Sequence, residues 1–425
     1  MRPFLAIFLI VPLAGQTWDP GDRINAAIGR AAHEKLKFSF EFRSRYEHRD
    51  GPLFGRNPDV TADLVRTRFG VTANPVPWLK ISALAQDGRS PWYGPNAPNN
   101  IRDPLDLQEG YVELFGNRKT GWQVVAGRQM LGYGEGRLIG SPQWAALART
   151  WDAGRVRYRL AKAEFEFLVV SPIKVRIGEF NVPVFGDRIW GMYNVFPNLI
   201  GKTLLELYLL RHDQNRIGGF VGGNRAAGTD RLGVNTFGGR WVGKLVAGWS
   251  YSLEGALQNG RRGPAEMKGA AWHSAFTHKV NVAGRAADLS LEYNFASKDF
   301  DQMYPAIHDK YGHIDAFAWR NLHNARALLV TPVSKALTVN LMYDEFWLVS
   351  KRDPAYAINN RPIAQAADGS AGRYLGREFD VYSTYRIKHW QFGAGVGYVM
   401  KGGFVKATTP GATPWFAYLF HTYSF

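Results

Sequence analysis

The chain has 425 residues, of which 46% are apolar, 14% aromatic and 21% charged. This composition is too hydrophobic for a disordered chain and too rich in charge for a bundle of membrane helices. Cysteine is absent, which excludes disulfide scaffolds, thiol catalysis and cysteine-based zinc sites. The net charge of +16 favours an anionic partner, which could be nucleic acid, a membrane surface or an acidic solute.

Residues 1–15 have the pattern of a secretory signal peptide. Arg2 precedes an apolar run from Phe4 to Ala14, and Gly15 follows it. The run is too short to cross a bilayer as a helix, so a buried amino-terminal helix is the alternative. Residues 16–36 are expected to form a polar periplasmic lead-in. No run of about 18 apolar residues follows, so a mature chain embedded in a membrane must be a β-barrel.

Polar and apolar residues alternate along most of the chain, as they do in a barrel wall whose side chains face lipid and lumen in turn. In residues 37–47 aromatic side chains recur at even positions, and polar side chains occupy the odd ones. We predict about eighteen strands of this kind. They lie near 37–47, 62–74, 77–88, 105–116, 121–131, 151–160, 162–171, 188–196, 202–211, 231–240, 243–258, 269–280, 285–297, 324–332, 335–349, 376–388, 390–400 and 414–425.

The connections between these segments alternate between long and short. Outer-membrane barrels have this asymmetry, with short periplasmic turns and long extracellular loops, whereas stacked soluble β-sandwiches have no reason to keep it. The predicted fold class is therefore all-β, an antiparallel transmembrane barrel of about 18 strands over residues 37–425 in the bacterial outer membrane. The long gaps are 48–61, 89–104, 132–150, 172–187, 212–230, 259–268, 298–323, 350–375 and 401–413.

The alternation also assigns the two faces of the wall. Phe40, Phe165, Leu291 and Leu341 are expected to face lipid. In the last predicted strand one face carries Trp415, Ala417, Leu419, His421, Tyr423 and Phe425, with Phe425 at the end of the strand. An outward aromatic residue at that position is typical of bacterial outer-membrane barrels.

A search for catalytic motifs finds no nucleophile elbow, phosphate-binding loop, H-E-x-x-H or G-x-G-x-x-G pattern. We therefore expect neither an enzyme nor a cofactor. His308 and His313 share the 298–323 segment with several aspartates and could bind a cation. A solvated, hydrogen-bonded loop fits better, because the spacing matches no defined metal motif. The aspartates are Asp299, Asp301, Asp309 and Asp315.

The predicted inward faces of the first seven strands carry many charged side chains. The cations are Arg43, Arg45, Arg66, Arg68, Arg155, Arg157 and Arg159, with Arg128 also placed inward although its segment alternates poorly. The anions that face them are Glu41, Glu47, Glu109, Glu113, Glu164 and Glu166.

Two hairpins are expected to use this charge differently. In the hairpin of residues 151–171, arginine and glutamate on neighbouring arms can form cross-strand ion pairs. In the hairpin of residues 37–74 arginine meets arginine, and two such charges about 6 Å apart repel by roughly 2 to 3 kcal/mol. This second arrangement predicts a site for anions, with Glu41 and Glu47 as partial compensation. Arginine suits carboxylates because its planar fork donates parallel pairs of hydrogen bonds.

Several segments resemble a known family. They are LVRTRFGV at 64–71, QEGYVEL at 108–114, GRQMLGYGEGRL at 127–138, RTWDAGR at 149–155, GREFD at 376–380, YPAIHDKYGHID at 304–315 and WRN at 319–321. Together they resemble the alginate export family of outer-membrane porins, over about residues 37–425. The Gly-Arg-Gln and Arg-Thr-Trp-Asp segments are the most specific of them.

The resemblance implies a monomeric, eighteen-stranded barrel with a narrow, arginine-lined conduit that selects polyanionic sugar chains. By motif, the conduit cations would be Arg68, Arg128, Arg149 and Arg320. Asp152 and Glu378 would be acidic partners that keep the pore from holding its anion too tightly. Gly110 interrupts the family's usual Glu-Ala-Tyr form but leaves the inward Glu109 in place.

We expect a passive outer-membrane channel for uronate-type oligo- or polysaccharide, exporting if the family role holds. One alternative is an uptake porin for small anions. The other is an outer-membrane enzyme that modifies lipid or polysaccharide, although no nucleophile with a base in reach is evident. The expected partners are the acidic polysaccharide or small anions, outer-membrane lipid and lipopolysaccharide, and the barrel assembly machinery. Nucleic acid is not expected as a partner.

Overall fold

The computed structural model describes residues 35–93, 100–199, 201–215, 231–308, 310–409 and 411–425, together with Asn25, Ala27, Gly29 and Arg30. The predicted signal peptide at 1–15 lies outside the described residues, as does most of the lead-in at 16–36. None of the described helices is long and apolar enough to cross a membrane.

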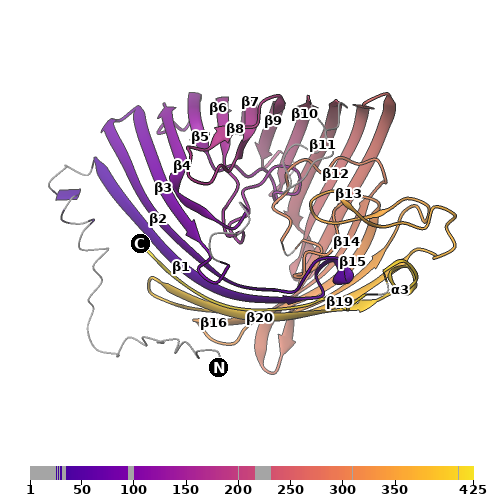
Figure 1. Cartoon of the computed structure of the whole chain (residues 1–425). Coiled ribbons are helices and arrows are strands. Elements are labelled where there is room, and N and C mark those ends of the chain that lie inside the picture. The colour runs from indigo at the N-terminus through magenta and orange to yellow at the C-terminus, as the bar shows by residue number, and fades with distance from the viewer. Residues whose placement is uncertain are drawn as a thin grey trace.

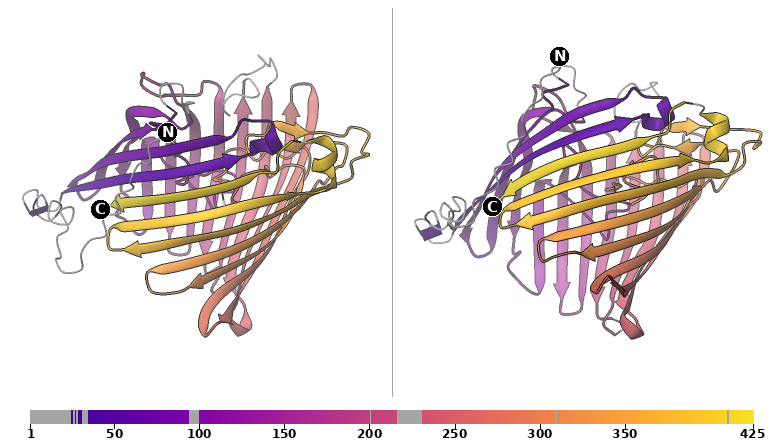
Figure 2. Two further views of the ribbon diagram at one scale, coloured as in Figure 1. Left: turned by 60° about the horizontal axis from the view of Figure 1, so that its bottom comes forward. Right: turned by 90° about the horizontal axis from the view of Figure 1, so that it is seen from below.

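Eighteen antiparallel strands of the described chain form a closed barrel (Figure 1). The first strand, β1 (Leu36–Asp50), pairs with β2 (Val60–Val76) on one side and with the last strand, β21 (Trp415–Ser424), on the other. Figure 2 shows this seam, where the indigo β1 lies beside the yellow β21. Closure leaves no strand edge unpaired, which a membrane requires of a sheet.

The other barrel strands are β3 (Leu79–Arg89), β4 (Asp103–Leu114), β5 (Gly121–Gln129), β6 (Trp151–Leu160), β7 (Ala163–Lys174), β9 (Asp187–Pro197), β10 (Leu204–Gln214), β11 (Leu232–Lys244), β12 (Trp249–Arg262), β13 (Ala265–Val282), β14 (Arg285–Ala296), β15 (Leu322–Pro332), β16 (Leu337–Trp347), β19 (Tyr374–Ile387) and β20 (Trp390–Lys401). The loops carry the short elements α2 (Pro52–Gly55), β8 (Val182–Pro183), η2 (Val246–Gly248), β17 (Ala355–Tyr356), β18 (Pro362–Ala364) and α3 (Gly403–Thr408).

Every predicted strand corresponds to one strand of the barrel, which confirms the fold class. One expected connection is wrong. The long loop predicted at 259–268 is a tight turn at Gly263 and Pro264, because β12 continues to Arg262 and β13 begins at Ala265. The turn before β12 also lies later than expected, at residues 245–248. Charged residues and glycine suggested a loop there, but at the extracellular end of a strand such residues are solvated and remain paired.

The predicted outward face is confirmed. Phe165, Leu291 and Leu341 are among the exposed large apolar side chains of the barrel surface. Phe40 lies directly opposite Phe69, which is 50% exposed, so both point outward. At the periplasmic end, Phe40 also stacks on Phe425, with 5.8 Å between ring centroids. Aromatic residues at this height match the interfacial girdle of outer-membrane barrels.

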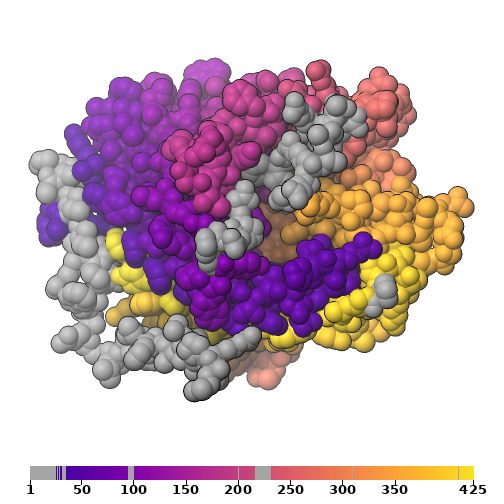
Figure 3. Space-filling view, viewed as in Figure 1, coloured from indigo at the N-terminus to yellow at the C-terminus, as the bar shows by residue number. Residues whose placement is uncertain are grey.

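Two long loops fold into the barrel instead of projecting from it. The first, residues 130–150, and the second, residues 297–321, join through a parallel bridge between Ile139 and Tyr304. Both residues are buried, and Tyr304 N donates to Leu138 O over 2.9 Å. In the space-filling view the described side chains fill much of the mouth and leave a hollow near its centre (Figure 3).

Candidate functional site

The basic wall, which we define as Arg43 and Arg45 on β1 with Arg66 and Arg68 on β2, lies inside the barrel as predicted. Arg43 is directly opposite Arg66 across the two strands. All of the basic-wall side chains are buried. Their partners are therefore protein groups rather than open solvent.

One turn of the first inward loop covers this wall. Arg43 donates to the backbone oxygens of Gln143 and Ala145, each over 2.7 Å. Arg66 donates to the same two oxygens over 3.1 Å. The guanidinium of Arg45 stacks on the Trp144 ring at 3.9 Å and donates to the Trp144 carbonyl. The loop therefore closes over the cations through neutral acceptors.

The remaining contacts of the basic wall include the two glutamates predicted to compensate it. Arg66 Nε lies 2.7 Å from Glu41, and Arg45 Nε lies 2.6 Å from Glu47. Arg68 Nε donates to the amide oxygen of Gln86 over 2.8 Å, and its Nη1 lies 3.7 Å from Glu41. A carbonyl or amide oxygen satisfies a donor without cancelling its charge. Among the residues that the structure describes, the four arginines of the basic wall therefore have only Glu41 and Glu47 to balance their charge, and the cluster stays positive.

The β6–β7 hairpin carries the predicted cross-strand ion pairs. Arg155 Nη2 lies 3.0 Å from Glu166, and Arg157 Nε lies 2.9 Å from Glu164. Arg159 Nε lies 3.0 Å from Glu164 as well. Three arginines thus share two glutamates, so every arginine of this hairpin has a glutamate partner and one positive charge is left over.

Glu109 faces the lumen, as predicted. It accepts a hydrogen bond from the backbone N of Met130 over 2.9 Å, at the start of the first inward loop. It also lines a luminal cavity of about 200 Å³ together with Glu113, Arg155 and Arg157. This cavity contains both signs of charge, unlike the basic wall.

Arg149 and Arg320 belong to the inward loops rather than to the wall. Arg149 Nη1 donates to the backbone oxygens of Gly140 over 3.0 Å and Tyr304 over 2.8 Å, which ties the two loops together. Burial lowers the pKa of the Arg149 guanidinium to about 10, so it keeps its charge at neutral pH. Arg320 donates to Lys298 O over 2.9 Å and stacks on a tyrosine ring.

Glu378 anchors the second inward loop. Its carboxylate is buried and accepts a hydrogen bond from the backbone N of Ile314 over 2.8 Å. Across the strands it lies opposite Asp344, which pairs with Arg326 over 2.9 Å. Asp380 is buried two residues along the same strand. We call Asp344, Glu378 and Asp380 the acidic wall.

Arg128 and Asp152 do not lie in the conduit, so their expected position is wrong. Arg128 on β5 lies opposite Asp152 on β6. Each is an even number of residues from Trp122 or Tyr158 on its own strand, and these two side chains are exposed on the outer face. Arg128 Nε donates to Asp152 over 2.9 Å. The two side chains therefore form an ion pair on the outer side of the wall, at its extracellular end.

The physical reason is that the partner Asp152 lets a charged residue stand on the outer face. Trp122, Val124 and Ala126 share the parity of Arg128 and are apolar, so the pattern itself points Arg128 outward, against the family motif. The β7–β9 loop covers the charge, since the Phe180 ring lies 4.9 Å from the Arg128 guanidinium. Asn181 O accepts from Arg128 Nη2 over 2.9 Å.

The expectation of a solvated loop around His308 and His313 is also wrong, since this segment lies in the barrel interior. His313 and Asp301 are buried, and His308 Nδ1 lies 2.9 Å from Asp315. Among the described residues no group of three or more histidine, aspartate or glutamate side chains could hold a metal ion. Asp309 lies outside the described residues.

Sequence reasoning missed two residues that position the first inward loop. Trp144 stacks face to face on His308, with 4.5 Å between ring centroids. Glu135 accepts from Ser252 over 2.6 Å and from Arg240 over 3.1 Å, on strands far along the chain. Burial raises the pKa of the Glu135 carboxyl, but Arg137, His273, Ser252 and Arg240 together lower it more, so its pKa lies well below the ordinary value. The unusual glycine cluster around Glu135 was the available signal.

The model of the alginate export family matches residues 34–416. The chain belongs to the alginate export family. Among curated proteins none matches this member of the family. The match covers nearly the whole barrel, including both inward loops and both walls.

Solved structures of outer-membrane proteins share the fold of this alginate export family member. OpdK from Pseudomonas aeruginosa superposes with a TM-score of 0.64 at 10% identity, over 92% of this chain and 99% of that chain. OccK8 (OprE) from the same organism gives 0.64 at 12% identity, over 92% and 98%. OccAB1 from Acinetobacter baumannii gives 0.62 at 12% identity, over 92% and 96%.

Family and fold together identify an outer-membrane β-barrel channel. They are those of a transport protein rather than of an enzyme. The identities are low, so the solved structures establish the architecture alone. The solute has to be inferred from the side chains of the lumen.

Proposed function

We propose that this channel passes anionic, uronate-type oligo- or polysaccharide, as in alginate export. The observation that carries the proposal is the excess of arginine over glutamate in the basic wall. Positive charge in a confined lumen concentrates anions and repels cations. The β6–β7 hairpin adds little to this potential because its charges are paired.

The contacts of Arg43 support carboxylate as the anionic group. Its two terminal nitrogens each donate to a separate oxygen over 2.7 Å, from Gln143 and Ala145. A carboxylate offers two oxygens to the same planar fork. A uronate would therefore exchange with the loop backbone at Arg43 and Arg66, gaining charge compensation that the carbonyl oxygens cannot provide.

A small-anion uptake porin is the second candidate. It is favoured by the link between the two inward loops, which narrows the lumen through Ile139, Tyr304 and Arg149. A polymer requires these loops to move aside, whereas a small anion requires less room. In both candidates the basic wall selects the charge of the solute.

The experiment is block of single-channel current in planar bilayers by oligomers of matched length. We expect uronate oligomers to block wild-type current more strongly than neutral glucan oligomers. The double variant Arg66→Gln with Arg68→Gln should lose most of this difference. Arg89→Gln with Arg188→Gln is the control, because it removes the same charge from the exposed outer face.

Equal block of the wild-type channel by charged and neutral oligomers would contradict the proposal. Block by inorganic anions and single uronates but not by longer oligomers would favour the small-anion porin. In the first case the basic wall would only anchor the first inward loop, whereas in the second it would still select the charge of the solute.

A further inference from the structure

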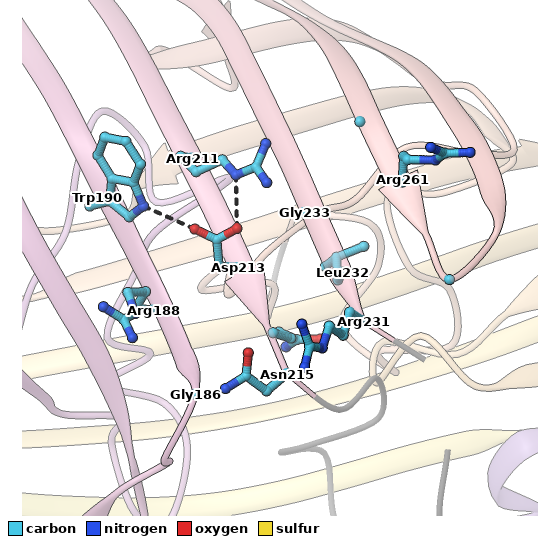
Figure 4. A pocket seen from close by; sticks show the side chains of 13 residues that line it. Gly186, Arg188, Trp190, Arg211, Asp213, Asn215, Arg231, Leu232, Gly233 and Arg261 are labelled. Atoms are coloured by element: carbon cyan, nitrogen blue, oxygen red, sulfur yellow. Dashed lines mark hydrogen bonds and ion pairs between the residues drawn. The ribbon is translucent and has the colours of Figure 1, made fainter. Parts of the chain in front are cut away.

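A basic pocket lies on the outer surface of the barrel, at the extracellular ends of β9 to β12 (Figure 4). It has a volume of about 790 Å³. Its cationic side chains are Arg188, Arg211, Arg231 and Arg261. Glycine residues at 186, 233, 260 and 263 line it as well and leave the space between the arginines open.

The strand register shows that this pocket faces outward. Arg211 lies opposite Trp190, which is 42% exposed on the lipid side, and Arg188 lies opposite Asp213. Toward the membrane on the same face, β9 and β10 continue with the exposed apolar Met192 and Leu209. On β11 and β12 the hydrogen-bonded pair Asn235 and Asn259 comes first, followed by the exposed Phe237 and Leu257. The pocket therefore sits at the upper edge of the apolar band.

The cations of the pocket outnumber its anions. Asp213 is the acidic residue among its lining, and it pairs with Arg211 Nε over 2.8 Å while accepting from the Trp190 indole over 3.0 Å. Within the described part of the chain, the side chains of Arg188 and Arg231 form no hydrogen bond or ion pair. Arg261 donates only to a backbone oxygen in the adjoining turn, over 3.4 Å.

We propose that this pocket binds the phosphorylated headgroup of the outer-leaflet glycolipid, lipopolysaccharide. Arginine forks bind phosphate through paired, charge-assisted hydrogen bonds. Basic pockets at the edge of the apolar band are suited to lipid headgroups, because the acyl chains can lie on the band below. Among the described residues, Arg188 and Arg231 have no paired counter-charge at this height of the barrel. The proposal does not depend on the solute of the pore.

The test uses the full-length protein in detergent, with binding of bisphosphorylated lipid A measured by native mass spectrometry. The variant is Arg188→Gln with Arg231→Gln and Arg261→Gln. Its charge-matched control is Arg285→Gln with Arg386→Gln and Lys388→Gln, which alters exposed residues at the opposite, periplasmic end. Retained heat-modifiable migration on gels shows that each variant remains a folded barrel.

We expect the pocket variant to bind lipid A at least about tenfold more weakly than the wild type, which corresponds to losing a few charge-assisted contacts. The periplasmic control should bind like the wild type, and dephosphorylated lipid A should bind weakly to every form. Equal lipid A binding by the pocket variant and the wild type would overturn the proposal. So would equal binding of dephosphorylated lipid A. Displacement of lipid A by an equal concentration of inorganic phosphate would overturn the assignment to a lipid.

Discussion

The β1–β2 and β6–β7 hairpins present arginines to the same lumen but surround them differently. In β6–β7 each arginine meets glutamate on the neighbouring strand, as Arg159 meets Glu164 at 3.0 Å. In β1–β2 Arg43 faces Arg66, and both donate to loop carbonyls. The first arrangement balances most of the charge within the wall. The second satisfies the hydrogen bonds of the arginines but leaves a positive potential. The residues around a row of arginines therefore decide whether it stabilises the wall or attracts anions.

The largest effect is expected from removing the shared counter-charge of β6–β7. Glu166 is buried and accepts from Arg155 over 3.0 Å and Arg157 over 2.6 Å. Glu166→Gln should cost about 3 kcal/mol of unfolding free energy, at the lower end for a buried pair, because it removes the buried counter-charge of the half-buried Arg155 and Arg157. Urea unfolding in lipid vesicles measures this cost.

Glu164→Gln is the matched control on the same strand. Its side chain is 26% exposed, so water can replace part of the lost interaction, and about 1 kcal/mol or less is expected. Equal costs for the two substitutions would break the view that burial makes Glu166 structural.

The next largest effect is expected from placing a charge on the lipid-facing side of the barrel. Its cost in unfolding free energy is the reference for substitutions in the lumen. Leu291 lies near the middle of β14 and is 51% exposed. Leu291→Arg should cost about 2 to 4 kcal/mol, whereas the adjacent, inward Ser290→Arg should cost less. Phe40→Arg, near the periplasmic girdle, should cost only about 0 to 1 kcal/mol. Unfolding in vesicles that showed equal costs for Leu291→Arg and Ser290→Arg would contradict the assigned faces.

A smaller effect on stability but a clear effect on the pore is expected from Arg43→Gln with Arg66→Gln. The loop turn at 143–145 loses contacts worth about 1 to 2 kcal/mol, while relief of the arginine repulsion offsets part of this loss. Single-channel conductance and current noise should both rise, because the first inward loop is released. Conductance and noise identical to wild type would show that these arginines do not hold the loop.

The smallest effect concerns the shape of one cation rather than its charge. Arg45→Lys keeps the charge but loses the planar stack on Trp144 at 3.9 Å, at a cost of about 0.5 to 1 kcal/mol. Thermal unfolding compares it with Arg45→Ala, which should cost more. If Arg45→Lys were as stable as wild type, the stack would contribute nothing to holding the loop.

The strands could be predicted from the sequence because their signals are local. Alternation along β1 places Phe40 outward and Arg43 inward from neighbouring residues alone. The prediction failed at Arg128, where the family motif was preferred to the apolar parity of Trp122, Val124 and Ala126. The loop at 259–268 failed because polar residues at a solvated strand end resemble a turn.

The inward loops could not be predicted, because their contacts join distant segments. Arg43 reaches Gln143 across 100 residues of sequence. Every residue has a backbone carbonyl, so the sequence pattern cannot indicate which carbonyl accepts a hydrogen bond from a given arginine. The charge of the basic wall was therefore predictable, while the group that covers it was not.

The reversal potential in planar bilayers under a salt gradient tests the central claim most directly. The wild-type channel should prefer anions, and the preference should weaken as salt rises, because the Debye length falls from about 10 Å at 0.1 M to about 3 Å at 1 M. Arg66→Gln with Arg68→Gln should shift the potential toward cations. Arg159→Gln with Glu164→Gln, which removes an ion pair without changing the net charge, should leave it unchanged. A non-selective wild type, or equal shifts in the two double variants, would contradict the account.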